Sequence, residues 1–224
     1  MTFKSIEEKI ISKYKLPREY LTNYYPANYF DYYIDVGARG IKNPWHLHKM
    51  GMNNPKTLCF GYEPDLPWFE ELKREVENLD NVKLYPHGFS SKSSIVIPDG
   101  TANTVDLKDI ISQHNINLDS RWMIKFDCEG CEYFLLEQRY NVDILKKASH
   151  IALEFHSVNV SQNFFTDKYN YPDSFKLGES WMNDNFSDTH SIFVTSQERG
   201  MRTYILLAQN IMDEKDNLFL KDLL

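Results

Sequence analysis

The chain has little cysteine, no long apolar run and no excess of positive charge, and each shortage excludes a class of protein. Only three cysteines occur among 224 residues, Cys59, Cys128 and Cys131, which suits a reducing compartment better than a secreted domain held together by disulfides. No stretch approaches the ~18 apolar residues that cross a bilayer, and the N-terminal segment lacks the apolar core of a signal peptide. We therefore expect a cytoplasmic protein without a membrane span.

The net charge of the chain indicates which kinds of partner it can bind. Lys and Arg number 25 against 32 Asp and Glu, which gives a formal net charge of −7. An acidic chain is poorly suited to gripping a phosphate backbone, so we expect a small-molecule or glycan partner and no nucleic acid. Aromatic residues make up 14% of the chain and could line a pocket as well as a core. Nothing in the composition indicates an oligomeric state.

The length and the even composition predict one domain. No repeat, low-complexity tract or Pro/Gly/Ser linker divides residues 1–224, and ~150 residues is typical of one domain. We expect an N-terminal helical and aromatic extension over 1–31, a ligand-binding core over 32–156, and a region over 157–224 that ends in a hairpin.

Alternating strand-like and helix-like segments predict a doubly wound α/β fold. Short β-branched and aromatic runs are typical of buried strands, and apolar residues recur between them at helical spacing. Strands separated by helices form a mostly parallel sheet covered on both faces, whereas the last two strands predict an antiparallel hairpin at one edge. The expected strands are 32–36, 57–62, 82–85, 94–97, 122–127, 151–155, 191–195 and 203–208, and the expected helices are 5–14, 68–79, 104–114, 129–138 and 175–186.

The loop after the first strand is the first candidate ligand site, because ligands of doubly wound sheets bind beyond the carboxyl ends of the strands. Gly37 permits a sharp turn and Gly40 a close approach of the backbone to a ligand. The G-x-G-x-x-G pattern that surrounds the pyrophosphate of a dinucleotide is incomplete, and an acid here suits a ligand with a cationic centre and an amino-acid tail. The loop reads Asp35-Val36-Gly37-Ala38-Arg39-Gly40.

Polar residues also follow the second and third strands. Glu63 ends the second strand, where a carboxylate can accept both ribose hydroxyls of an adenosine. After the third strand, Phe89 offers a flat aromatic ring and Ser90 a small polar group where an adenine would lie. A core position for Phe89 is an equally good interpretation.

The densest cluster of acids follows the strand 122–127. This strand ends in Asp127, and the expected helix after it begins with Glu129 and Glu132, which the positive end of the helix dipole would favour. The dipole does not explain Lys125 and Asp127 in or at the end of a buried strand, where unpaired charges are costly. Pairing of these two residues with each other is one explanation, and a role in the site is the other.

A second pair of polar residues ends the strand 151–155. Glu154 and His156 stand two positions apart, so both side chains can project from one face of the strand.

Four of these blocks, at 34–40, 60–65, 124–132 and 152–156, resemble the FkbM family of S-adenosylmethionine (SAM)-dependent methyltransferases in order and spacing. The resemblance spans about 32–156. It implies a Rossmann-like class I methyltransferase that moves a methyl group from SAM to a hydroxyl, mostly on sugars. Carried over by position, Asp35, Gly37 and Gly40 form the cofactor loop and Glu63 holds the ribose. Asp127 and Glu129 face the reaction centre.

The resemblance leaves two routes for activating the acceptor. A sugar hydroxyl needs a base or a metal at neutral pH. Asp127 is the first candidate base, and His156 is the second because an ordinary imidazole pKa of ~6.5 suits proton uptake. Alternatively, Asp127, Glu129, Glu154 and His156 bind Mg²⁺ through oxygen-rich ligation. The residues leave both routes open.

Other interpretations compete with this one. Cys128 and Cys131 form a C-x-x-C, but zinc needs two further ligands and redox use leaves the surrounding acids unexplained; in the resembled family the two positions are commonly apolar or small. An NAD-dependent oxidoreductase is weakened by the missing glycine. A non-catalytic sugar- or nucleotide-binding module is the remaining alternative. Acceptor contacts are expected from the aromatic stretches 20–30 and 159–186.

Overall fold

The computed structural model describes residues 27–39, 47–97, 100–156, 174–198 and 201–212. The expected helix 5–14 and most of the proposed acceptor stretches lie outside these residues. In chain order the elements are β1 (Tyr32–Val36), α2 (Leu47–Asn53), β2 (Leu58–Tyr62), α3 (Leu66–Val76), β3 (Val82–Tyr85), β4 (Gly88–Phe89), β5 (Ser94–Ile97), β6 (Gly100–Val105), α4 (Leu107–Gln113), β7 (Trp122–Phe126), the 3₁₀ helix η2 (Cys131–Glu137), α5 (Arg139–Leu145), β8 (His150–His156), α7 (Ser174–Phe186), β9 (His190–Glu198), β10 (Met201–Ala208) and α8 (Gln209–Met212).

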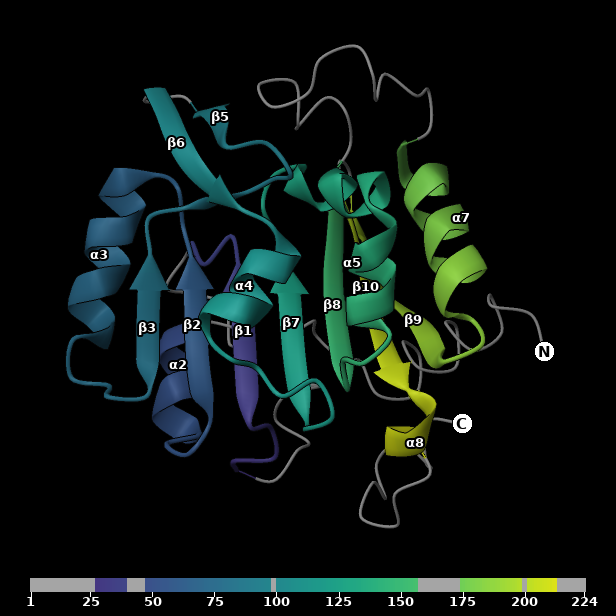
Figure 1. The fold of residues 1–224 in the computed structure, drawn as a ribbon, viewed down its shortest axis with the longest axis horizontal. Helices are drawn as coiled ribbons and strands as arrows, with labels where there is room; N and C mark the ends of the chain where they lie inside the picture. The colour runs from purple at the N-terminus through teal and green to yellow at the C-terminus, as the bar shows by residue number, and fades with distance from the viewer. Residues whose placement is uncertain (1–26, 40–46, 98–99, 157–173, 199–200, 213–224) are drawn as a thin grey trace.

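The main sheet has seven strands in the order β3-β2-β1-β7-β8-β10-β9 (Figure 1). The first five strands are parallel and follow the 3-2-1-4-5 order of a doubly wound Rossmann sheet. β10 is antiparallel to both β8 and β9. The predicted fold class is therefore confirmed: a mostly parallel, doubly wound sheet with an antiparallel pair at one edge.

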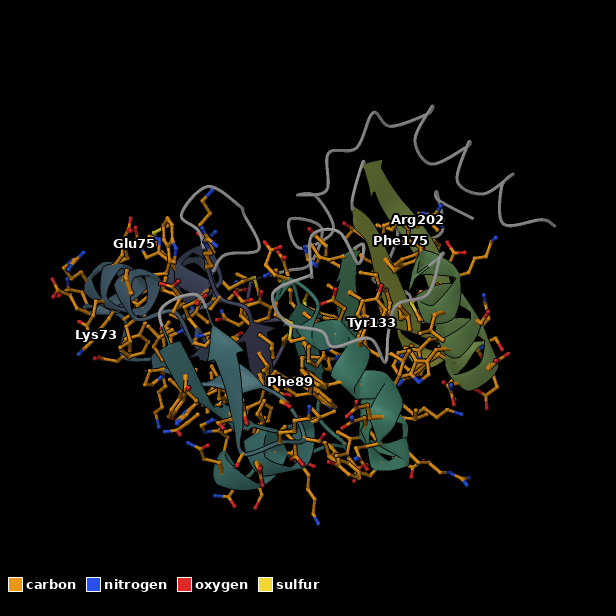
Figure 2. All side chains as sticks on the ribbon, turned by 90° about the horizontal axis from the view of Figure 1, so that it is seen from above. Lys73, Glu75, Phe89, Tyr133, Phe175 and Arg202 are labelled. Atoms are coloured by element: carbon orange, nitrogen blue, oxygen red, sulfur yellow. A yellow bond between two sulfur atoms is a disulfide. The ribbon has the colours of Figure 1, made fainter. Side chains whose placement is uncertain are left out.

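The alternation of side chains along each strand builds two cores. In β1, Ile34 and Val36 pack on the face covered by α4, η2, α5 and α7, whereas Tyr33 packs on the face covered by α2 and α3. This is the expected consequence of successive side chains pointing to opposite faces of a strand. Seen from above (Figure 2), Phe89 and Tyr133 lie inside the molecule, and Lys73 and Glu75 of α3 lie at its outer edge.

Local sequence explains where two of the helices begin. Asp65 accepts a hydrogen bond from the backbone N–H of Trp68 and caps α3, and Asp106 forms a capping box with Asp109 at the start of α4, so the first turns are satisfied. Thr104 and Asp106 are the two possible starts of the helix expected over 104–114. Asp106 is confirmed as its N-cap, and Thr104 is wrong because it belongs to β6, which pairs with β5. None of the described helices is long and apolar enough to cross a membrane.

Candidate active site

The site lies where the carboxyl ends of β1, β2, β7 and β8 meet. β1 turns immediately after Val36 through Gly37, whose φ is +80°. A Cβ at Gly37 would meet the carbonyl oxygen and carbon of Asp127, the residue that follows β7. Glycine is therefore required both for the left-handed backbone and for the close contact between the two strand ends.

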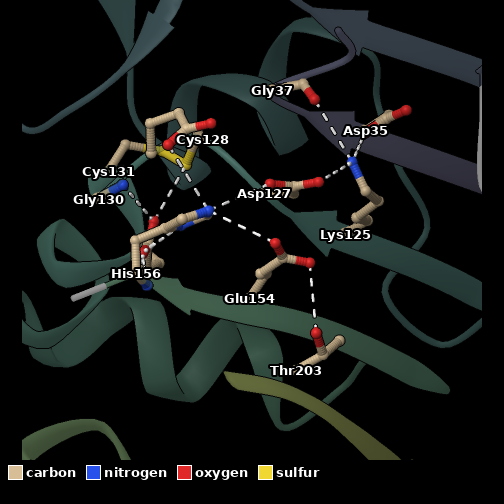
Figure 3. A network of polar contacts seen from close by, with 12 residues as sticks. Asp35, Gly37, Lys125, Asp127, Cys128, Gly130, Cys131, Glu154, His156 and Thr203 are labelled. Atoms are coloured by element: carbon tan, nitrogen blue, oxygen red, sulfur yellow. Dashed lines mark hydrogen bonds and ion pairs between the residues drawn. A yellow bond between two sulfur atoms is a disulfide. The ribbon is translucent and has the colours of Figure 1, made fainter. Parts of the chain in front are cut away.

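Lys125 joins the two central strands beneath this turn. The parallel register of β1 and β7 sets Lys125 opposite Asp35, and its Nζ lies 2.9 Å from Asp35 Oδ1 and 3.6 Å from Asp127 Oδ2. Nζ also lies 3.4 Å from the carbonyl oxygen of Gly37 (Figure 3). Lys125 of β7 therefore pairs with Asp127 at the end of its own strand and with Asp35 of the neighbouring strand β1.

Burial and pairing oppose each other in this ion pair. Asp35 is 1% exposed and Lys125 8% exposed. Burial raises the pKa of Asp35 to about 6, although Lys125 works against the rise. Burial alone would lower the pKa of Lys125, but the charges of Asp35 and Asp127 raise it above its ordinary value. Both groups are therefore charged at neutral pH, and each depends on the other for that charge.

Glu63 stands apart at the end of β2. It is 4% exposed, and its Oε1 accepts a hydrogen bond of 2.9 Å from the backbone N–H of Asp65. Burial raises the pKa of Glu63 to about 7, and the charge of Arg39 opposes the rise. The Arg39 guanidinium lies over the ring of Trp68, 4.4 Å from its centroid. This places a cation and an aromatic ring near the predicted ribose acceptor.

Three carboxylates converge on one edge of the His156 ring. Nε2 of His156 lies 3.5 Å from Glu154 Oε1, 3.7 Å from Asp127 Oδ1 and 3.8 Å from Glu129 Oε2 (Figure 3). The prediction that Glu154 and His156 share a face of their strand is confirmed by this contact. Asp127 and Glu129 keep 25% and 46% of their side chains exposed, so a ligand can reach them.

The acids decide the protonation of His156. Burial alone would lower its pKa, but the charge and hydrogen bond of Glu132, the hydrogen bond of Glu154 and the charge of Asp127 together raise the pKa to about 11. The ring is therefore an imidazolium at neutral pH in the unliganded protein.

The remaining predicted cofactor residues lie in different environments. Ala38 is fully buried and Ser90 is 2% exposed. Phe89 is 3% exposed and packs edge-on against Phe126, with ring centroids 5.1 Å apart. Gly40 lies outside the described residues. Phe89 is thus part of the core in this structure, and its role as an adenine platform stays a prediction.

The loop after Asp127 differs from the sequence expectation. Cys128 and Cys131 are joined by a disulfide, whereas the small number of cysteines predicts a reducing compartment. Glu129 and Gly130 adopt left-handed backbone, with φ of 55° and 113°. The helix consequently begins only at Cys131 and is of the 3₁₀ type, so Glu129 is not in its first turn.

Reasoning from sequence missed part or all of the role of three contributors to the site. The expected pairing of Lys125 with Asp127 is confirmed at 3.6 Å, but the contact of Lys125 with Asp35 was not predicted. Glu132 was expected only as an acid favoured by the helix dipole, and its signal was one more charge in the right block. Thr203 donates a hydrogen bond of 3.3 Å to Glu154 Oε2 from a strand 49 residues further on, and no local pattern marks it.

The site as a whole has a surplus of negative charge. Within this group of seven residues, five carboxylates face the two cations Lys125 and His156. Such an arrangement favours a positively charged ligand and disfavours an anionic one. The carboxylates are Asp35, Asp127, Glu129, Glu132 and Glu154.

Among known proteins, the chain is similar to solved structures, and the similarity is one of fold. No family model and no curated protein matches the chain. Similar solved structures include precorrin-6y C5,15-methyltransferase from Geobacter metallireducens, with 11% identity over 84% of this chain and 85% of that one and a TM-score of 0.46. The MTase domain of METTL16 aligns with 13% identity over 92% and 66%, with a TM-score of 0.47. The O-methyltransferase TomG from Streptomyces achromogenes, in complex with SAM, aligns with 12% identity over 92% and 88%, with a TM-score of 0.49. At these identities the alignments say nothing about which reaction this chain performs.

Replacement of Lys125 by Met should destabilise the protein by about 3–5 kcal/mol, because Asp35 would then be buried without its cation. Urea unfolding at pH 7 measures this change. The matched control is Lys146→Met, which breaks an ion pair with the exposed Asp188 and should change the unfolding midpoint little. Equal midpoints for Lys125→Met and the parent would contradict a structural role for the buried pair.

Proposed function

We propose that the protein is a SAM-dependent O-methyltransferase that moves a methyl group to a hydroxyl of a sugar or glycan acceptor. The observation that carries the proposal is the surplus of carboxylates at the carboxyl ends of β1, β7 and β8, beside the tight turn at Gly37. A sulfonium is a cation, and its amino-acid tail carries an ammonium group, so both are favoured by this field.

The same charges weigh against the oxidoreductase alternative. A nicotinamide dinucleotide brings a pyrophosphate with two negative charges, which requires backbone N–H groups and no nearby acids. Here the turn at Gly37 lies against the backbone of Asp127, and Asp35 stands two residues before Gly37. The missing glycine of the dinucleotide pattern points the same way.

Glu63 is assigned to the ribose of the cofactor. Its Oε1 accepts from the backbone N–H of Asp65, which fixes the direction of the carboxylate. Each carboxylate oxygen has two lone pairs, so the two oxygens can still accept from both ribose hydroxyls. The side chain follows β2, one strand away from the turn at Gly37, as a ribose attached to a sulfonium would require. The other proposed cofactor residues are Asp35, Gly37, Ala38, Arg39, Gly40, Ser90 and Asp127, with Phe89 at the adenine.

Catalysis in this proposal is alignment followed by proton removal. The acceptor oxygen attacks the methyl carbon, the C–S bond breaks, and sulfur keeps the electron pair. The hydroxyl proton goes to Asp127, which is partly exposed and held from the other side by Lys125. His156 is the second candidate base, but with a pKa of about 11 it holds a proton in the unliganded site. It would first have to lose that proton to act as a base.

SAM should bind more tightly as the pH rises from 6 to 8. The pKa of Glu63 is about 7, and the ionised form accepts both ribose hydroxyls, so the Kd should fall about tenfold and then level off. Calorimetry at both pH values measures this dependence. Glu63→Gln should weaken binding and reduce the pH effect to about twofold, the part that Asp35 contributes through its pKa of about 6. The exposed control Glu77→Gln should leave it intact. If NAD binds and SAM does not, the methyltransferase proposal is wrong.

Replacement of Asp127 by Asn should lower kcat about 100-fold or more, because the base is lost while the geometry is kept. The Kd for SAM should rise by a smaller factor than kcat falls, because Asp127 is also one of the carboxylates that favour the sulfonium. The assay uses labelled SAM with nucleotide sugars, free glycans and phenols as acceptors, and Asp143→Asn on the exposed side of α5 serves as the control. A parental rate in Asp127→Asn would remove this residue from the role of base.

A second candidate for activating the hydroxyl is a bound Mg²⁺. Ligand atoms of Asp127, Glu154 and His156 lie within 4.8 Å of one another, and Glu129 lies beside them. Two carboxylates and a neutral imidazole are a donor set that a divalent cation accepts. His156, whose pKa of about 11 keeps the ring protonated in the unliganded site, would therefore have to release its Nε2 proton when the ion binds. The ion would lower the pKa of the acceptor hydroxyl.

If a bound Mg²⁺ activates the hydroxyl, EDTA should abolish methyl transfer and added Mg²⁺ should restore it. Titration of the apoprotein with Mg²⁺ by calorimetry should show binding that Glu154→Gln weakens. Full activity in EDTA, with no heat of Mg²⁺ binding, would leave Asp127 as the base without a metal.

A further inference from the structure

Glu132 is a buried acid that the proposed chemistry does not use. Its side chain is completely buried, and it stands in the first turn of η2. A buried carboxylate is costly unless it is paired and hydrogen-bonded. Its ionic partner is His156, at 3.0 Å between Glu132 Oε1 and His156 Nδ1.

Both oxygens of Glu132 have defined partners. Oε1 accepts from the backbone N–H of His156 at 2.7 Å as well as from the ring at Nδ1. Oε2 accepts from the backbone N–H of Gly130 at 2.9 Å. One carboxylate therefore connects the end of β8 with the loop that carries Glu129.

The bond at Nδ1 determines where the opposite edge of the ring points. With Nδ1 held by Glu132, Nε2 faces Asp127, Glu129 and Glu154 at 3.5 to 3.8 Å. Rotation of the ring by 180° would put carbon atoms at both positions, and the contacts with the acids would be lost. The backbone of His156 is fixed independently, because Tyr133 donates its hydroxyl to the His156 carbonyl at 2.9 Å.

We propose that Glu132 is a positioning residue, which holds the His156 ring through Nδ1 so that Nε2 is directed at the carboxylates of the reaction centre. The proposal rests on the proposed methyl transfer and deepens it. Glu132 itself touches neither cofactor nor acceptor. Its contribution is to orient the ring that organises Asp127, Glu129 and Glu154.

Replacement of Glu132 by Gln should lower kcat about tenfold to hundredfold, as is typical when a hydrogen bond that orients a functional histidine is removed. The Kd for SAM should stay near the parental value, because the cofactor contacts proposed above do not involve this side chain. Glu137→Gln is the matched control, since Glu137 belongs to the same helix and bonds Ser91 instead. It should retain the parental kcat.

A double-mutant cycle separates positioning from a general loss of structure. If Glu132 acts through His156, Glu132→Gln should not lower kcat further in a His156→Gln background. A further loss of the same size as in the parent would show that Glu132 acts by another route and would overturn the proposal.

A measurement on the unaltered protein covers the case in which Glu132→Gln does not fold. The Nδ1 proton of His156 should give a downfield NMR signal that exchanges slowly with water, because it is buried and bonded to Glu132. A rapidly exchanging Nδ1 proton would contradict the proposal. This signal does not depend on turnover, so a chain that fails to bind SAM but shows it refutes the proposed function and leaves the positioning role standing.

Discussion

The arrangement of the site depends on the ion pairs that the buried ammonium of Lys125 makes with two carboxylates. The ammonium links Asp35 of β1 with Asp127 beyond β7 and reaches the carbonyl of Gly37. Two acids at adjacent strand ends would otherwise repel each other inside the sheet. The cation allows the strands to end in register with their charged side chains facing the same edge.

The remaining residues of the site carry more negative than positive charge. His156 neutralises part of it, and Glu132 is satisfied by hydrogen bonds, but Asp127 and Glu129 remain partly exposed. Like charges this close raise the free energy of the empty site, which a bound cation would lower. Functional sites typically lower the stability of a protein in this way. The apolar side chains buried in the two cores on either side of the sheet offset that loss.

The sequence predicts the sheet well where strands are buried and locally patterned. Strands 32–36 and 82–85 have the predicted bounds, and the parallel order follows from the alternation of elements. It also predicts that Asp127, Glu154 and His156 converge, because carboxyl ends of parallel strands share an edge. The disulfide and the left-handed backbone at Glu129 could not be predicted, because both are set by the tight loop between Asp127 and η2. From sequence, Glu132 is explained by the helix dipole alone, because its partner His156 is 24 positions away and no local pattern connects the two.

The place of β10 in the sheet has a consequence for how the chain folds during synthesis. β10 is made after β9, yet it lies between β8 and β9. β9 therefore cannot join the sheet until residues up to Ala208 have left the ribosome, and until then the edge of β8 is an open template for wrong pairing. Because Thr203 reaches Glu154 from this strand, the nascent chain acquires the described set of site residues only after β10, which follows the other six strands of this sheet in the chain, has been translated.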